Sequence, residues 1–340
     1  MSAALGIILL SAAVAVLLAA GRMRRNQQLL SDANEESRAA LRTLSRALAA
    51  TGVGGTQYAY LDESGNRVMR SALIFQNGVA PLGPKMPQAP DTITLLRYKA
   101  DRRSELLSDL TNSRFYVTPD PRRATTPGVV AQHFEEGDSA LITNFQRAML
   151  VPVDRAQLDG GTPRVEVRTG GMIPETLQEQ NGIRIDMGAS VFPVQIVRYR
   201  IAYVPASEQH PERGDLVMDT LHPRTGAVLN TSVLARDVED LQVQWASDSN
   251  GDGIHDGFSD VGPTAGFTDP YLLYARVSLS ARTSAPLIGD KGDLQAKGEM
   301  TPFERGLDLS GPTAQPEASG FRRRVLSTVV LLKNLAASRI

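Results

Sequence analysis

The amino-acid sequence predicts an α+β fold, in which one long N-terminal helix is followed by an antiparallel β-rich globular head. Three observations support this prediction. The segment Met1 to Ala20 carries no charge, and no Pro or Gly interrupts Asn26 to Ala50. After Gly55 the apolar residues recur at every second position instead of every third or fourth. With 340 residues, the chain is long enough to bury a sizeable core.

The amino-acid composition excludes several classes of function. The formal net charge of -1 lacks the basic excess that a dedicated nucleic-acid-binding protein normally shows. The chain contains no cysteine, which excludes disulfides, thiolate nucleophiles, Cys-ligated zinc and iron–sulfur clusters.

The first half of the helix, residues 1–21, is predicted to be a transmembrane segment. Twenty apolar residues in helical geometry span about 30 Å, which matches the hydrocarbon core of a bilayer. The first charges, Arg22, Arg24 and Arg25, come directly after this run. No charged region precedes it, as it would in a cleaved signal peptide.

The second half, residues 22–52, is predicted to be an amphipathic continuation of the same helix. Its apolar and small residues recur at spacings of three and four, while charged residues occupy other positions. A cluster of glycines at 52, 54 and 55 then ends the pattern, as C-terminal caps do. The residues on the predicted buried face are Leu30, Ala33, Ser37, Leu41, Leu44 and Leu48.

Residues 53–340 are predicted to form the β-rich head. Alternation of apolar and polar residues predicts strands, and a hairpin turn is expected at 62–66. Two stretches, 102–128 and 284–320, are expected to be irregular insertions because their composition is poor in core-forming residues. The predicted strands are Gln57–Leu61, Arg67–Phe75, Thr92–Tyr98, Ser139–Val153, Val197–Tyr203, Leu216–Leu221, Val238–Trp245, Ala275–Arg282 and Arg324–Leu332.

A loop rich in Asp, Asn and Gly follows the predicted strand Val238–Trp245 and is a candidate calcium site. Oxygen-bearing residues occur at every second position, with a Gly at the sixth position and a backbone carbonyl at the seventh, a spacing that suits Ca²⁺. Position twelve is Ser259 instead of the usual Glu, with an acidic residue beside it. The alternative is a solvated turn without metal. The candidate ligands are Asp248, Asn250, Asp252, Ile254 through its carbonyl, Asp256 and Asp260.

Other motifs do not indicate an enzyme. The four histidines are scattered, and no nucleophile elbow, phosphate-binding loop or dinucleotide fingerprint occurs. The short basic run at 322–324 is below what a nucleic-acid-binding stripe requires. We therefore expect a non-enzymatic protein with no catalytic residues and no specific nucleic-acid site.

Several segments of the chain, in the right order, resemble the PilW-like minor pilins of the type IV pilin and pseudopilin superfamily. The most specific is the stretch Val238–Trp245 followed by its Gly-Asp-Gly loop. The resemblance implies a pilin-like fold for the helix and head. The segments that resemble the family are 37–52, 91–98, 135–153, 194–204, 234–257 and 321–336.

This resemblance implies a minor pilin that helps to prime type IV pilus assembly and sits at or near the pilus tip, with a role in motility, adhesion or DNA uptake. Its partners would be other minor pilins and the major pilin, contacted through the N-terminal helix. The protein would lie in the inner membrane with its head in the periplasm before assembly, and in the extracellular pilus afterwards. Two alternatives remain open: a type II secretion pseudopilin, and a membrane-tethered periplasmic binding module or hydrolase.

Pilin precursors carry a basic leader and a glutamate near the start of the mature helix, and neither is present here. We therefore expect Met1 to be an internal methionine, with leader and glutamate encoded upstream. The leader would then supply the cytoplasmic positive charge that orients the helix. The alternative is a genuine variant without the glutamate.

Overall fold

The computed structural model describes most of the chain in well-defined segments. These are residues 2–52, 57–78, 90–98, 102–108, 110, 113–119, 126–135, 138–145, 147–160, 164–169, 173, 179–180, 183–207, 212–248, 250, 252, 254–260, 262, 272–285, 323–332 and 334.

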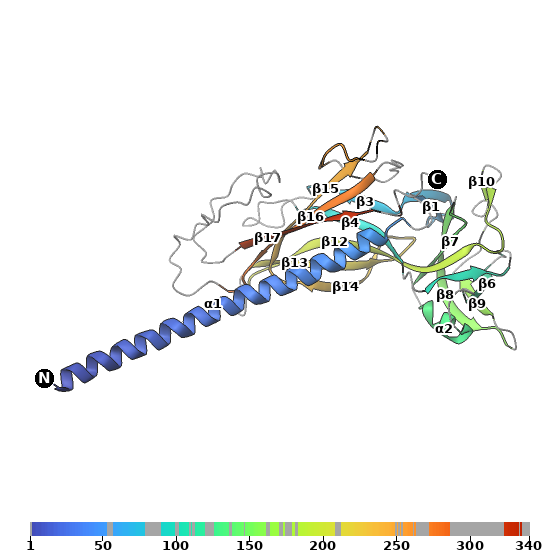
Figure 1. The fold of residues 1–340 in the computed structure, drawn as a ribbon. Helices are drawn as coiled ribbons and strands as arrows, with labels where there is room; N and C mark the ends of the chain where they lie inside the picture. Colours follow the sequence, from blue (N-terminus) through green and yellow to red (C-terminus); the bar gives the residue numbers. More distant parts are fainter. Residues whose placement is uncertain are drawn as a thin grey trace.

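The helix α1 (Ser2–Ala50) runs for 49 residues without a break. Figure 1 shows that its N-terminal half projects away from the rest of the molecule, whereas its C-terminal half lies along the head. The helix ends because Gly52 adopts φ of +90°, a left-handed conformation that residues with a side chain rarely adopt. The hydroxyl of Thr51 donates to the carbonyl of Ala47 at 2.9 Å and occupies one of the last carbonyls.

A twelve-stranded sheet forms most of the head. Its longest strand, β12, pairs with β13 and β7 along one side and with β4 and β5 along the other. One edge of the sheet is β14 and the other is β2. Its strands are β1 (Gln57–Leu61), β2 (Arg67–Ser71), β3 (Leu73–Gln76), β4 (Thr92–Tyr98), β5 (Ser104–Leu106), β6 (Arg114–Pro119), β7 (Ser139–Thr143), β8 (Ala148–Leu158), β9 (Val165–Thr169), β12 (Ser190–Val204), β13 (Arg213–Leu221) and β14 (Val228–Ala235).

A second sheet of three antiparallel strands also packs against the buried face of α1. It consists of β15 (Val238–Ser247), β16 (Leu272–Arg282) and β17 (Arg323–Leu331). Two short strands, β10 (Glu179–Gln180) and β11 (Ile183–Arg184), form a separate hairpin. The short helix α2 (Pro127–His133) packs on β6, β8 and β9, at the end of the head far from the N-terminus (Figure 1).

The main core lies where α1 is enclosed between the two sheets. It combines buried α1 residues with apolar side chains from β3, β4, β12 and β13 and from all three strands of the second sheet. A separate core under α2 and a third between β1, β8 and β12 fill the distal part of the head. The helix therefore acts as a structural element that both sheets pack against.

The expected fold class, α+β with a pilin-like antiparallel head, is wrong. The described chain is mostly β, with two helices against seventeen strands, and its main sheet is large and mixed. The mixing arises where β1 lies parallel to β8, with Ala59 opposite Met149. A parallel pair needs a long crossover connection, and alternation within single strands gives no information about such non-local pairing.

The individual strands differ from expectation in several places. The run Ser139–Val153, expected as one strand, divides into β7 and β8, and Arg67–Phe75 divides into β2 and β3. The stretch 102–128, expected to be irregular, contains β5 and β6. Strands β9 and β14 were not expected. Most of the expected insertion 284–320 lies outside the described residues.

Candidate functional site

One face of the C-terminal half of α1 packs against the head and is buried there. Leu44 and Leu48 are fully buried, and Leu41 is nearly so. The smaller residues Ser37, Ala40 and Ala47 complete this face at spacings of three and four. Burying each leucine contributes on the order of 2 kcal/mol relative to exposure. We call these six residues the seat.

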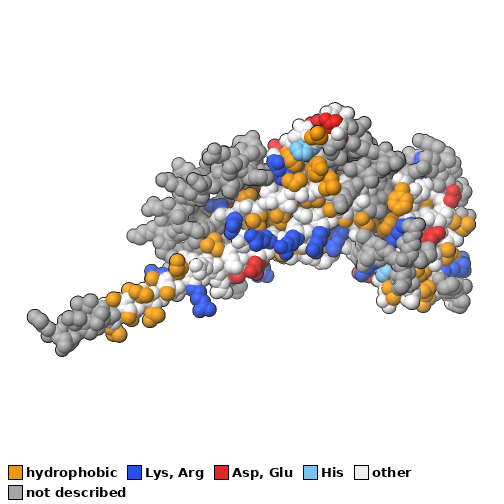
Figure 2. All heavy atoms as spheres, viewed as in Figure 1, with side chains coloured by type: hydrophobic (Ala, Val, Ile, Leu, Met, Phe, Trp, Pro, Cys, Tyr) orange, Lys and Arg blue, Asp and Glu red, His pale blue; other side chains and the backbone are white. Residues whose placement is uncertain are grey.

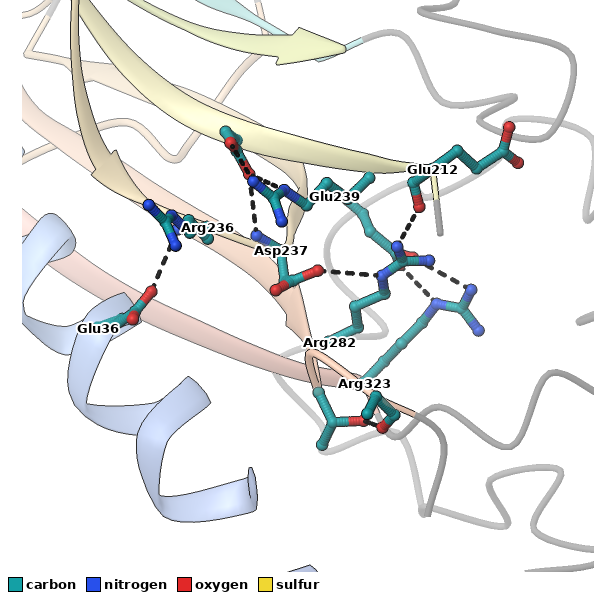
Figure 3. Close-up of polar contacts among 11 residues, drawn as sticks. Glu36, Glu212, Arg236, Asp237, Glu239, Arg282 and Arg323 are labelled. Carbon is teal, nitrogen blue, oxygen red and sulfur yellow. Dashed lines mark hydrogen bonds and ion pairs between the residues drawn. The ribbon is translucent and has the colours of Figure 1, made fainter. Parts of the chain in front are cut away.

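Polar contacts surround the point where α1 enters the head. Figure 3 shows Glu36 of α1 facing the turn between β14 and β15, where its Oε2 accepts a hydrogen bond from the backbone N–H of Arg236 at 3.2 Å. Asp237 in this turn has φ of +56°, which Asp tolerates better than most residues. The turn carries the chain from the large sheet to the small one.

Arg282, at the end of β16, holds this turn in place. Its guanidinium lies 3.7 Å from the Asp237 carboxylate and 3.5 Å from that of Glu239, and it donates to the backbone carbonyl of Glu212 (Figure 3). Its backbone N–H also donates to the carbonyl of Asp237 at 2.9 Å. Burial raises the pKa of Asp237, and the charges of Arg282 and Arg213 partly offset that increase.

Two further ion pairs complete the cluster. Arg213 Nε lies 3.0 Å from Asp215 Oδ1, and Arg323 Nε lies 2.5 Å from Glu239 Oε2. The three arginines and the three carboxylates of these ion pairs balance in charge, and together they fix the geometry of the turn. Sequence reasoning missed it because its members come from four separate strands.

The N-terminal half of α1 has no such seat. Apolar side chains are exposed on all sides of it, and Leu17 is 71% exposed. Among the helices of the described chain, none has a stretch that is long and apolar enough to cross a membrane. The exposed apolar side chains of this half include Leu10, Val14, Val16, Leu17, Leu18 and Met23.

The predicted calcium ligands lie in the loop after β15, and their oxygens hold the loop together. Asp248 is buried, and its Oδ1 accepts the backbone N–H of Asp252 at 3.1 Å. Asn250 Oδ1 accepts the same N–H at 3.0 Å, and Asp252 Oδ1 accepts the N–H of Ile254 at 2.7 Å. The contacts of Asn250 and Asp252 are successive Asx turns, and the contact of Asp248 spans both residues.

Asp256 and Asp260, the remaining predicted side-chain ligands, both lie in contact with β15. The backbone N–H of Asp256 donates to the carbonyl of Ser247 at 2.9 Å, and Asp260 Oδ1 accepts a hydrogen bond from Gln244 at 3.1 Å. Across the described residues, no three His, Asp or Glu side chains come together in a way that could hold a metal ion. Calcium binding by this loop therefore stays a prediction.

Ring contacts add to the stability of the same loop, and they were not predicted from the sequence. The rings of His255 and Phe258 lie 5.1 Å apart, and His255 meets Tyr274 of β16 edge-on at 5.6 Å. The guanidinium of Arg276 stacks 3.8 Å above the Phe258 ring.

Two buried carboxyl groups at the junction of the sheets were also missed. Asp91, just before β4, accepts hydrogen bonds from the backbone N–H groups of Val243 at 2.7 Å and Gly78 at 3.1 Å. Burial raises the pKa of Asp91 to about 7, and it raises the pKa of Asp240 to about 6. Isolated Asp residues in loops and strands give no sequence signal for such a role.

No family model matches the chain, and neither a curated protein nor a solved structure matches it. The resemblance to PilW-like minor pilins therefore stays a prediction from the sequence.

Proposed function

We propose that this protein is a non-enzymatic minor pilin that takes part in priming type IV pilus assembly and sits at or near the pilus tip. The proposal rests on α1 and on the sequence resemblance.

One observation carries the proposal: a single unbroken helix has two different environments. Its C-terminal half packs on the head through buried Leu44 and Leu48, whereas its N-terminal half exposes Leu10, Leu17 and Leu18 to solvent. Figure 1 shows that this half projects from the head. Exposed apolar surface on this scale is unfavourable in water by about 25 cal/mol per Å². A partner that covers it is therefore expected.

Two partners would cover this half in succession. Before assembly, the apolar start of the helix would lie in the inner membrane, with the head in the periplasm. After assembly it would pack against the helices of other minor pilins and the major pilin in the extracellular filament. In both states the seat and the Arg282 cluster would keep the head fixed to the helix.

The experiment is to recover the tagged full-length chain from sheared-filament and membrane fractions, comparing wild type with Leu17→Glu. The variant should fold normally because Leu17 contacts no part of the head. We expect it to be at least tenfold depleted from the filament fraction, because a charge would be buried between helices. Gln27→Glu, on an exposed polar position, is the matched control and should behave as wild type.

A wild-type chain that is absent from filaments in a cell that produces them would contradict the proposal. Recovery of the Leu17→Glu variant from the filament fraction at the wild-type level would show that this half of the helix is not needed for assembly. That result is expected if the helix is a simple membrane tether.

A further inference from the structure

Three arginines lie side by side on β6, β9 and β8, at the end of the head far from the N-terminus (Figure 1). Arg114 of β6 is directly opposite Arg168 of β9, and Arg168 is directly opposite Arg155 of β8. Opposed residues of neighbouring strands project to the same face of a sheet, with Cα atoms about 5 Å apart. The other face of these strands carries the core under α2, which includes Phe115 and Val167. We call the three arginines the arginine ladder.

The arginine ladder is open to solvent. The side chain of Arg114 is 54% exposed and that of Arg168 is 41% exposed, and Arg155 is exposed as well. Figure 2 shows Lys and Arg side chains on the surface at this end of the head. A ligand can therefore approach the guanidinium groups without displacing any residue of the core.

Carboxylates neutralise only part of the positive charge of the ladder. Glu166 is buried in the next row of the same face, 2.7 Å from Arg168 and 3.9 Å from Arg114. Within the described residues, Arg155 and its exposed neighbour Asp154 form no hydrogen bond and no ion pair. Like charges directly opposite one another destabilise a sheet. An anion bound along the ladder would remove this repulsion.

The ladder suits a ligand that carries several oxyanion groups. A guanidinium presents its donors in a planar fork that matches the oxygens of sulfate, phosphate and carboxylate groups. A single ion pair at this degree of exposure contributes little to affinity. Tight binding therefore requires several anionic groups of one ligand to bind at the same time.

Two observations favour an acidic polysaccharide over a nucleic acid. Proteins that bind single strands stack the bases on aromatic rings, but Arg164 already covers one side of the Tyr116 ring beside the ladder, at 4.1 Å. Proteins that bind duplex DNA neutralise about six to ten phosphates and place a helix or a β-ribbon in a groove. The ladder offers three arginines on the face of a sheet.

We propose that the arginine ladder binds the sulfate and carboxylate groups of an acidic polysaccharide. The three arginines span about 10 Å across the strands, so successive anionic groups of one polysaccharide chain can each meet a different guanidinium. Glu166 holds Arg168 in place between the two outer arginines. This binding is a property of the head alone and does not rest on the proposed function.

The test is binding of the full-length chain, purified in a non-ionic detergent, to immobilised heparin as the sulfated polysaccharide. Biolayer interferometry gives the dissociation constant. We expect the affinity to fall at least about fivefold between 0.05 M and 0.15 M NaCl, because the contacts are ionic. Desulfated heparin should bind at least about tenfold more weakly than heparin.

Substitutions locate the site on the ladder. Arg114→Ala combined with Arg155→Ala should lower the affinity for heparin at least about tenfold, with an unchanged melting temperature because both side chains are exposed. Arg155→Ala alone should lower it at least about threefold, and this variant serves if the double variant does not fold. The matched control is Arg38→Ala combined with Arg42→Ala, which removes the same charge from exposed positions of α1 and should bind as wild type.

Several results would overturn the proposal. Wild-type chain that does not bind heparin, or binds desulfated heparin equally well, would exclude recognition of the sulfate groups. An equal loss of affinity in the α1 control would show that overall charge, and not the ladder, attracts the polymer. DNA or phosphatidylglycerol vesicles that bind more tightly than heparin, and lose binding with the ladder variants, would assign the face to nucleic acid or to lipid.

The outcome is separable from that of the proposed function, because the assay contains no filaments. A chain that enters filaments but does not bind heparin would overturn the polysaccharide site alone. A chain that binds heparin through the ladder but is absent from filaments would support the site and overturn the filament role.

Discussion

Asn334 caps the end of α1 from the opposite end of the chain. Its Nδ2 donates to the carbonyl of Ala50, the last residue of the helix, at 3.2 Å, and also lies 3.5 Å from the hydroxyl of Tyr98. The carbonyls at a helix C-terminus have no partner within the helix, so this contact replaces water there. The helix end is therefore fixed by residues from β4 and from the segment after β17.

Substitutions at two neighbouring positions of α1, one inside the seat and one outside it, should differ strongly in their effect on the free energy of unfolding. Leu44→Ala should lower the free energy of unfolding by about 2–5 kcal/mol, because Leu44 is fully buried between the two sheets. Thr43→Ala, one position away and exposed, should change it by less than about 0.5 kcal/mol. Unfolding can be followed through Trp245, the only tryptophan, which packs at 5.3 Å from Phe75 in the same core. Equal losses in the two variants would contradict the proposed seat.

Within the Arg282 cluster, Arg282 should contribute more to the free energy of unfolding than Arg323. Arg282→Ala should cost about 3–5 kcal/mol, because it leaves Asp237 and Glu239 poorly compensated in a buried site. Arg323→Ala removes a half-exposed partner of the same Glu239 and should cost less than about 1 kcal/mol. Chemical denaturation of both variants checks this, and an equal or reversed order would show that Arg282 does not hold the turn.

Much of the head's local structure could be predicted from sequence, because alternation shows directly which strand face is buried. The strand Val197–Tyr203 is an example: Val197, Tyr199 and Ile201 are buried, while Arg198 and Arg200 pair with Asp219 of β13. The glycine that ends α1 was predicted for the same kind of local reason.

The arrangement of the strands could not be predicted in this way. The parallel contact of β1 with β8 joins residues ninety positions apart, from Ala59 to Met149, and no local pattern encodes it. The roles of the buried polar residues could not be predicted from the sequence for a related reason. Asp91 and Arg282 acquire their roles only when distant strands bring Val243 and Asp237 beside them.

The buried carboxyl groups predict an unusual pH dependence. In the folded state the pKa of Asp91 is raised to about 7 and that of Asp240 to about 6, both mainly by burial. The folded state therefore binds more protons than the unfolded state between pH 4 and 7, and the stability from these groups is lost as pH rises through that window. We expect the free energy of unfolding to be higher at pH 5 than at pH 8, by on the order of 2 kcal/mol.

The matched variants are Asp240→Asn, which should reduce this dependence and leave the larger contribution of Asp91, and exposed Asp154→Asn, which should leave it unchanged. Thermal unfolding of wild type and both variants across pH 4.5–8.5 measures how stability depends on pH. A melting temperature that falls on acidification across the whole range would contradict the assignment.

The loop after β15 yields a prediction about calcium. Asp248, Asn250 and Asp252 place side-chain oxygens in one loop, and Ca²⁺ could replace part of the hydrogen-bond network that these oxygens form. We expect 1 mM Ca²⁺ to raise the melting temperature by a few degrees, because a ligand bound only to the folded state stabilises it. Asp252→Ala should abolish the increase, whereas Asp154→Ala should preserve it. Identical melting curves with calcium and with chelator would show that the Asx turns alone hold the loop.

Mass spectrometry of purified sheared filaments tests the central claim most directly, namely that α1 carries this chain into a filament. We expect peptides of this chain in that fraction at a level well below the major pilin, and their loss with Leu17→Glu but not with Gln27→Glu. Recovery of the chain from membranes alone, in cells whose filaments are intact, would contradict the claim and leave α1 as a tether.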